Sequence, residues 1–329
     1  MIDSAITPIP PILPTTATHT LTAFSSPAVI SDRLMVKRFR NTKETFIEWL
    51  LFCAAAISVL TTAGIVYVLV SESIGFFRAV PIWSFLTDTV WSPLFSEPRY
   101  GIVPLLAGTL TTSLVALTVA IPLGTIVAIY LSEFASHRLR ETVKPILELL
   151  GGIPTIVYGH FALIVMTPFL QILFPNLPGF SMLSAGLVMG IAIIPYISSL
   201  AEDAMSAVPM SMREGSYGLG ATRFQTAIKV VFPAALSGIL SAYILGISRA
   251  VGETMIVAVA AGGQPNLTMN PMEPAQTISA YIVQVALGDL PHGSIAYQSI
   301  FAAGLSLMLM TLFFNILGHA LRRRFREAY

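Results

Sequence analysis

Charged residues are scarce in this sequence. Asp, Glu, Lys and Arg together make up 11% of the 329 residues, whereas apolar residues make up 55%. A soluble globular domain carries about 25% charged residues, so this chain lacks the polar surface that a water-soluble fold needs. We infer an integral membrane protein. The formal net charge of +1 gives no reason to expect a nucleic-acid partner.

Cysteine and the motifs of several enzyme classes are also missing. The single cysteine, Cys53, lies in an apolar run, which excludes an internal disulfide, a CxxC motif and a thiolate metal site. No lysine stands in the Gly-Lys-Ser/Thr run of a P-loop. Ser248, in "GISRAVG", lacks the second glycine of a G-x-S-x-G nucleophile motif, and no apolar span contains an aspartate. We predict no catalytic residues, no metal site and no cofactor bound by this chain.

The N-terminal segment has neither the basic start nor the apolar core of a secretory signal. Its first 30 or so residues are rich in Pro, Thr, Ser and Ala. We predict a disordered cytoplasmic tail over residues 1–45, or alternatively a docking segment that orders on a partner. Residues 46–101 then hold the first transmembrane helix and an outer loop. Residues 102–329 form a core domain with five transmembrane helices and a cytoplasmic loop at 203–233.

Apolar stretches long enough to cross the hydrocarbon layer as helices need roughly 20 residues. The sequence has six, at residues 47–71, 103–131, 151–174, 183–201, 234–261 and 297–320. They predict an all-α, polytopic membrane protein with six transmembrane helices. Lys and Arg concentrate on the cytoplasmic side of such proteins. Of the 18 here, only Arg78 and Arg99 fall on one side and Arg249 within a span, so both termini are predicted to be cytoplasmic.

The fourth loop carries two helix-start signals and a glycine joint. Ser211 to Glu214 and Thr222 to Gln225 each have the spacing of a capping box, in which the first and fourth residues satisfy each other's backbone N–H. Gly218 and Gly220 between them suit a left-handed turn, and the second helix should break at Pro233. The loop is predicted to be two short, rigid helices; an amphipathic loop lying on the lipid surface is the alternative.

The same loop resembles the signature of ABC-importer permeases, which reads E-A-A, three residues, Gly, nine residues, I-x-L-P. Here Glu214, Gly215 and Ser216 are followed at those offsets by Gly220, and then by Val230-Val231-Phe232-Pro233. The segments "GTLTTSLVALTVAIPLGTIVAIYLSEFA" (108–135), "GGIPTIVYGHFAL" (151–163) and "ISRAVGETMIVAVAAGG" (247–263) resemble the permease subunits of bacterial phosphate importers, of the PstC type.

This resemblance implies a fold, a location and a set of partners. The fold would be that of type I ABC-importer permeases, in the bacterial inner membrane. The partners would be a second, PstA-like permease subunit as heterodimer, a cytoplasmic PstB-like ATPase dimer that uses ATP and Mg²⁺, an external PstS-like phosphate-binding protein, and membrane lipid. The coupling loop, with Glu214, Gly215, Ser216, Gly220, Phe232 and Pro233, would dock on the ATPase and transmit its closure into the membrane.

Two charges lie near the middle of the fifth span, Arg249 and Glu253 in "SRAVGETM". Residues four apart on a continuous helix share one face. Each charge costs about 2.5–3.5 kcal/mol at a span's centre, so such residues face a protein interior or a wet cavity. Our hypothesis is that Arg249 offers a transient site to a crossing oxyanion, that Glu253 partly neutralises it between ions, and that Gly252 keeps the path wide. An ion pair that only fixes helix packing is the alternative.

Other interpretations stay open at this point. The cargo could be another oxyanion, such as molybdate, sulfate or phosphonate. From a different class, a secondary transporter driven by an ion gradient would work without an ATPase, although no internal half-repeat is evident. "GGIP" at 151–154 is the best hinge candidate. The outer loop at about 262–296 is either a docking surface for the external binding protein or an ordinary solvated connector.

Overall fold

The computed structural model describes residues 27–93, 95 and 97–324, and these residues form helices joined by short loops. The chain divides into two compact units, residues 1–65 and Val66–Tyr329. The helices, in chain order, are α1 (Pro27–Ala79), α2 (Ile82–Thr87), α3 (Val103–Ile129), η1 (Tyr130–Phe134), α4 (His137–Gly151), α5 (Thr155–Phe161), η2 (Ala162–Met166), α6 (Thr167–Leu173), α7 (Met182–Ser206), α8 (Met210–Gly218), α9 (Arg223–Thr226), η3 (Ala227–Val231), α10 (Phe232–Ala234), α11 (Leu236–Gly252), α12 (Met255–Ala260), α13 (Ile278–Ala286) and α14 (Ile295–Arg324).

The first unit consists, in its described part, of the N-terminal portion of α1. This helix begins at Pro27, so residues 27–45 of the predicted tail are helical, and the role of the tail stays a prediction. Residues 1–26 lie outside the described residues. The part of α1 from Glu44 to Ala79 is long and apolar enough to cross a membrane. Cys53 is exposed on it as a free thiol.

Five helical segments of the described chain have the length and composition of membrane spans: Glu44–Ala79, Val103–Phe134, Thr155–Leu173, Met182–Ser206 and Ile295–Arg324. They match five of the six predicted stretches. A sixth span is obtained when Arg223–Ala234 and Leu236–Gly252, which meet at a bend of 73°, are taken as one broken span. The continuous helix predicted over residues 234–261 is wrong, because α11 ends at Gly252 and α12 begins only at Met255.

The centre of the second unit is the packing of α3 against α7. Gly186 and Gly190, four residues apart on α7, let the two backbones approach closely, as small residues do in membrane helices. A Cβ atom at Gly190 would lie 2.7 Å from the carbonyl oxygen of Ala116 on α3. The surrounding core is made of buried aliphatic side chains, including Val188, Met189 and Ile193. Tight packing here makes α3 and α7 the scaffold on which the other helices rest.

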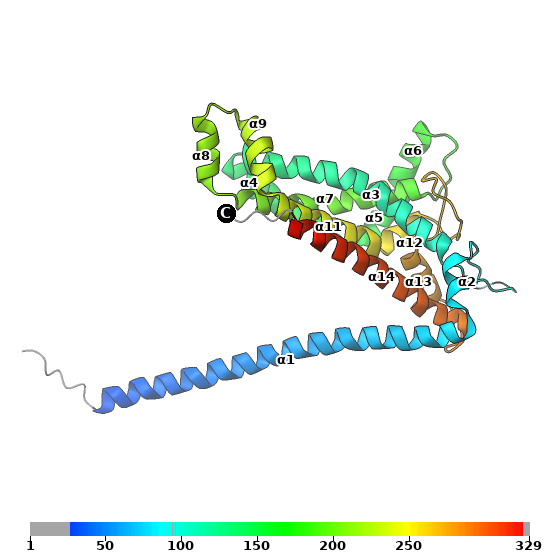
Figure 1. The fold of residues 1–329 in the computed structure, drawn as a ribbon, viewed down its shortest axis with the longest axis horizontal. Helices are drawn as coiled ribbons and strands as arrows, with labels where there is room; N and C mark the ends of the chain where they lie inside the picture. Colours follow the sequence, from blue (N-terminus) through cyan, green and yellow to red (C-terminus); the bar gives the residue numbers. More distant parts are fainter. Residues whose placement is uncertain (1–26, 94, 96, 325–329) are drawn as a thin grey trace, which may run out of the picture. The chain divides into compact units, whose positions relative to one another are not determined.

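Helices α2 and α13 lie at one end of this unit (Figure 1), and that end holds a cluster of edge-to-face aromatic rings. The ring centroids of Trp91 and Tyr281 are 4.9 Å apart, and both side chains are almost fully buried, so Trp91 packs in the core. Helix α13 lies within residues 262–296, and its buried face means that this segment is more than a solvated connector. Hydrogen bonds from Thr268 and Asn270 lower the pKa of Glu273 in the exposed part of the segment.

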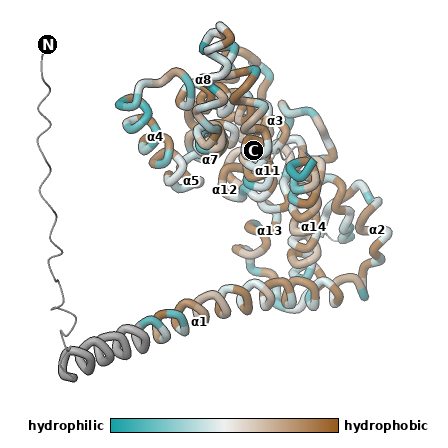
Figure 2. The backbone as a smooth tube through the Cα atoms, turned by 60° about the vertical axis from the view of Figure 1, so that its left-hand side comes forward, coloured by the Kyte–Doolittle hydropathy of each residue, from teal (hydrophilic) through white to brown (hydrophobic). Residues whose placement is uncertain are grey.

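Helices α8 and α9 lie together at the opposite end of the same unit, near the end of α14 (Figure 1). In Figure 2, α14 is apolar along most of its length, whereas hydrophilic and apolar residues are mixed along α4. Helix α4 is amphipathic and has no buried residues, as expected of a helix that lies at a membrane surface. The unit therefore has two distinct ends, one built around aromatic rings and one around the α8–α9 loop.

Candidate functional site

The α8–α9 loop is a helix, a glycine joint and a second helix. Gly220 has φ of +83°, the left-handed conformation that glycine adopts without strain, and its N–H donates to the carbonyl of Tyr217 at 2.9 Å. At the start of α9, Thr222 accepts from the N–H of Gln225 and the Gln225 side chain accepts from the N–H of Thr222. The predicted joint at Gly220 and the second capping box are confirmed.

The predicted capping box at the start of α8 is wrong. The helix begins at Met210, after Pro209, and no side chain caps it. Ser211 is therefore already inside the first helical turn, where it cannot cap the helix. Pro209 takes the N-cap position instead, with extended backbone, so the helix begins one residue before Ser211. Glu214 is exposed and makes no hydrogen bond or ion pair with the described residues.

A buried arginine fixes α8 to the membrane part of the chain. Arg213 is 9% exposed. Its guanidinium donates to Glu133 Oε1 at 2.9 Å and to the carbonyl of Met205 at 2.9 Å, with a further bond to the carbonyl of Val208. Glu133 lies in η1, at the end of the span that starts with α3. The ion pair therefore connects α8 directly to the ends of two spans, α3–η1 and α7.

A second contact holds the two short helices to each other. The hydroxyl groups of Ser216 on α8 and Thr226 on α9 are 2.9 Å apart and hydrogen bonded. At the base of the loop, Phe232 is half-buried against the same apolar cluster as Met212 of α8. Pro233 is exposed in α10, just before the 73° bend. Phe232 and Pro233 thus form the base of the predicted coupling loop, and Ser216 braces its two helices.

The tip of the loop presents an exposed apolar surface. Leu219 is 91% exposed and Phe224 is 65% exposed. Beside them, Gly215, Gly218 and Gly220 have no other atoms within 4 Å of the position a Cβ would take. Large apolar side chains on a rigid polar loop, next to backbone without side chains, are typical of a surface that another protein covers.

A neighbouring ion-pair cluster ties α4 to α7. Glu202 is fully buried and accepts hydrogen bonds from Arg140, Lys144 and Ser206, with Lys144 Nζ at 2.9 Å from Oε2. Lys144 also pairs with Asp203. These basic residues contributed to the predicted orientation, and the structure assigns them a second role in fixing α4. A buried carboxylate with three donors is satisfied, whereas an unpaired one would be costly.

The fifth predicted span is broken where its charges lie. Glu253 has extended backbone at the end of α11, and its carboxylate accepts from the N–H groups of Met255 and Ile256 at the start of α12, at 3.1 and 3.4 Å. The hydroxyl of Ser279, on α13, donates to the carbonyl of Glu253 at 2.7 Å. Non-helical backbone at membrane depth is tolerated where the protein satisfies its polar groups, and Glu253 and Ser279 do so here.

Arg249 and Glu253 therefore do not share a helical face, and the predicted neutralising pair is absent from this structure. The guanidinium of Arg249 instead stacks on the ring of Tyr196, with Cζ 3.8 Å from the ring centroid. No described carboxylate lies within 4.0 Å of it. Gly252, one turn further on, has open space where a side chain would be. Arg249 is thus a cation with no carboxylate partner among the described residues, and Gly252 leaves open space near it.

Tyr196 also links this cation to the predicted hinge. Its hydroxyl donates to the carbonyl of Gly151, at the end of α4, and a Cβ at Gly151 would lie 3.2 Å from the tyrosine ring. Four residues of these contacts were not predicted from the sequence: Tyr196, Glu133, Glu202 and Ser279. Glu133 and Glu202 stand out in hindsight as carboxylates at span ends opposite basic loops, but Tyr196 and Ser279 carry no such signal.

The chain is similar in sequence to membrane subunits of known transporters. The family model described as "binding-protein-dependent transport system inner membrane component" matches residues 120–327, so the chain belongs to that family. It is 34% identical over 291 residues to the probable ABC transporter permease protein YqgH of Bacillus subtilis, covering 88% of this chain and 94% of the relative. It is 35% identical over 310 residues to the phosphate transport system permease protein PstC of Mesorhizobium japonicum, covering 87% and 91%.

The fold is similar to that of a solved transporter. A crystal structure of a bacterial ABC transporter that imports the acidic polysaccharide alginate contains a chain that superposes with a TM-score of 0.60 at 17% identity, covering 88% of this chain and 100% of that one. The chain is thus an all-helical, multi-pass inner-membrane permease subunit with an ABC-importer fold, and it is not catalytic. Membership of this family implies an ATPase and a binding protein as partners.

Proposed function

We propose that this chain is the PstC-type permease subunit of an ATP-driven importer of inorganic phosphate. The observation that carries the proposal is its identity of 35% over 310 residues to a phosphate transport system permease protein. The remaining assembly would be a PstA-like permease as heterodimer partner, a PstB-like ATPase dimer and an external PstS-like phosphate-binding protein. The fold would be of type I, with six spans and both termini cytoplasmic, as the Lys and Arg distribution favours.

The α8–α9 loop is the proposed coupling element. With this orientation it faces the cytoplasm, where its exposed Leu219 and Phe224 need a protein cover. The Arg213–Glu133 pair makes the loop rigid with respect to two spans, so a push on α8 moves the spans instead of bending the loop. Glu214, Gly215, Ser216 and Gly220 then form the docking surface, with Phe232 and Pro233 at its base.

Arg249 is the proposed mid-membrane site for the anion. A guanidinium stays protonated and can donate two parallel hydrogen bonds to a phosphate group. The Arg249 guanidinium stacks on the face of Tyr196 and has no ion-pair partner among the described residues. Its hydrogen-bond donors are therefore available to an anion, whereas those of an ion-paired arginine are not. Gly252 leaves space beside it. Glu253 contributes by holding the break open between α11 and α12.

Uptake by the reconstituted complex tests both the cargo and the site. Proteoliposomes with the four components would be loaded with ATP and Mg²⁺, and uptake of radiolabelled phosphate measured with molybdate, sulfate and a phosphonate as competitors. Arg249→Ala should reduce uptake by at least about tenfold, since it removes a charge-assisted pair. Arg78→Ala removes an exposed arginine of the same charge and should leave uptake unchanged.

Three outcomes would contradict the proposal at separate points. If another oxyanion inhibits uptake of radiolabelled phosphate at a lower concentration than unlabelled phosphate does, that oxyanion is the cargo. Normal uptake by Arg249→Ala would remove Arg249 from the pathway, and failure of that variant to co-purify with its partners would assign it to packing. Uptake by this chain alone, driven by an ion gradient, would favour a secondary transporter.

A further inference from the structure

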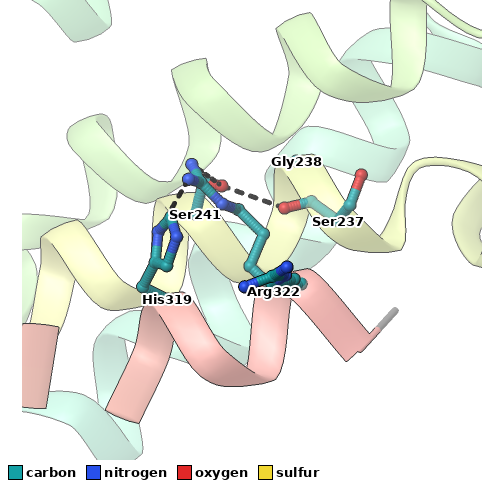
Figure 3. A pocket seen from close by; sticks show the side chains of 6 residues that line it. Ser237, Gly238, Ser241, His319 and Arg322 are labelled. Carbon is teal, nitrogen blue, oxygen red and sulfur yellow. Dashed lines mark hydrogen bonds between the residues drawn. The ribbon is translucent and has the colours of Figure 1, made fainter. Parts of the chain in front are cut away.

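A cavity lies between the start of α11 and the end of α14, and its lining includes none of the residues assigned to the coupling loop or to the Arg249 site. Its volume is about 640 Å³, and its lining residues are Ser237, Gly238, Ser241, His319, Arg322 and Arg323. Figure 3 shows the side chains of His319 and Arg322 on α14 facing those of Ser237 and Ser241 on α11. The two helices come from different spans, so the chain has folded to bring basic and hydroxyl groups together.

The basic groups in this cavity have no acidic partner among residues 27–93, 95 and 97–324. No described carboxylate lies within 4.0 Å of Arg322 or Arg323. Arg322 donates from Nη2 to His319 Nδ1 at 2.9 Å and from Nη1 to Ser241 Oγ at 3.5 Å. A guanidinium can only donate, so Nδ1 of His319 must be the acceptor. Within the described chain, the Arg322 guanidinium is held in place by His319 and Ser241 and by no carboxylate.

An apolar face of α14 leads to this cavity. Leu312 and Ile316 precede His319 and Arg323 at spacings of three and four residues, which places them on one helical face. Leu312 is 49% exposed and Ile316 is 61% exposed. A basic cavity at the end of a membrane-spanning helix, continued by an exposed apolar face, matches both parts of a phospholipid, the charged head group and the acyl chain.

We infer that this cavity binds a phosphate group, carried by an anionic phospholipid head group or by free inorganic phosphate. Forked guanidinium groups match the oxygens of either, and basic pockets between membrane helices on the cytoplasmic side are suited to anionic head groups. The inference rests on the proposed function only for the leaflet, which is the cytoplasmic one in the proposed orientation.

Binding to the purified full chain tests the inference. Phosphatidylglycerol and, separately, phosphatidylcholine would be titrated into the detergent-solubilised chain and counted by native mass spectrometry. Inorganic phosphate would be titrated calorimetrically into the same preparation. The test variant is R322Q/R323Q, and R324Q is the matched control, because Arg324 is the next residue on α14 but does not line the cavity.

A lipid source predicts that R322Q/R323Q weakens phosphatidylglycerol binding by about fivefold for each arginine removed, with R324Q and all phosphatidylcholine binding unchanged. A free-phosphate source predicts the same selective loss in the calorimetric titration. The inference is overturned if R324Q weakens binding as much as the double variant, or if the double variant binds both ligands like the parent chain. Arg249 is intact in every variant, so failure here leaves the proposed transport function untouched.

Discussion

Two of the breaks between helices differ in their surroundings, the α8–α9 joint and the α11–α12 break. At the joint, the backbone is satisfied by residues within a few positions, through Gly220 and the Thr222–Gln225 box. At the break, Glu253 caps α12 while Ser279 reaches back from α13, 26 residues further along the chain.

The difference follows from the solvent. Water satisfies backbone groups that local caps leave free, so a loop outside the membrane can be built from local signals alone. The hydrocarbon layer offers no such partners, so a break at that depth needs donors and acceptors from elsewhere in the fold. Single substitutions at the α8–α9 joint should therefore cost less activity than substitutions at the α11–α12 break. The exception is Arg213, which anchors the joint through its buried ion pair with Glu133.

Arg213→Ala should have the largest effect. It leaves Glu133 buried without its partner, and breaking a buried ion pair costs about 3–5 kcal/mol. We expect α8 to detach from η1 and the ATPase to be lost or uncoupled, as measured by co-purification of the complex and by phosphate-stimulated ATP hydrolysis. Arg223→Ala removes an exposed arginine from the same loop and should preserve both. Equal effects of the two changes would mean that loop charge, and not the buried anchor, matters.

Glu253→Ala should come next. It removes the acceptor for the backbone N–H groups of Met255 and Ile256 at the start of α12, and each group left unsatisfied costs about 1–3 kcal/mol. Uptake should fall by at least about tenfold while the ATPase still co-purifies. Glu253→Gln retains a carbonyl oxygen at the same position and should recover most of the uptake. If Gln is as damaging as Ala, the negative charge is needed, and the capping interpretation is wrong.

Substitutions of Tyr196 should have smaller effects on uptake. Two variants distinguish its contact with Arg249 from its contact with Gly151. Tyr196→Leu removes the ring under Arg249, a contact worth about 2 kcal/mol when desolvated, and should lower phosphate uptake. Tyr196→Phe keeps the ring and loses only the bond to the Gly151 carbonyl. We expect uptake by the Phe variant to lie between that of the Leu variant and the parent. A Phe variant as inactive as the Leu variant would assign the main role to the Gly151 contact.

Thr222→Ala should have the smallest effect. Loss of a side-chain cap costs about 1 kcal/mol, and the Ser216–Thr226 bond still braces the joint. Amide hydrogen exchange in α9 should quicken by about fivefold, with little change in transport. Ser211→Ala should not alter exchange in α8, because Ser211 caps nothing. If Ser211→Ala makes amide exchange in α8 faster, Ser211 does cap this helix, contrary to the structure.

Local chemistry made much of the fold predictable. Runs of apolar residues located five spans closely, and the glycine and Thr-x-x-Gln signals located the joint at Gly220 and the start of α9. The signature around Glu214 and Gly220 indicated the family that the match over residues 120–327 shows. Ser211 misled the prediction because Pro209, two residues earlier, starts the helix first.

By itself, then, the sequence determined which segments are apolar enough for the membrane and where water-exposed helices start and end, because those properties depend on neighbouring residues. Three features could be seen only in the folded chain: α11 stops at Gly252, Arg249 stacks on Tyr196 and Arg213 pairs with Glu133. Each of these depends on a partner distant in the chain. The spacing of Arg249 and Glu253 suggested a pair, but a backbone break supported by Ser279 outweighed it.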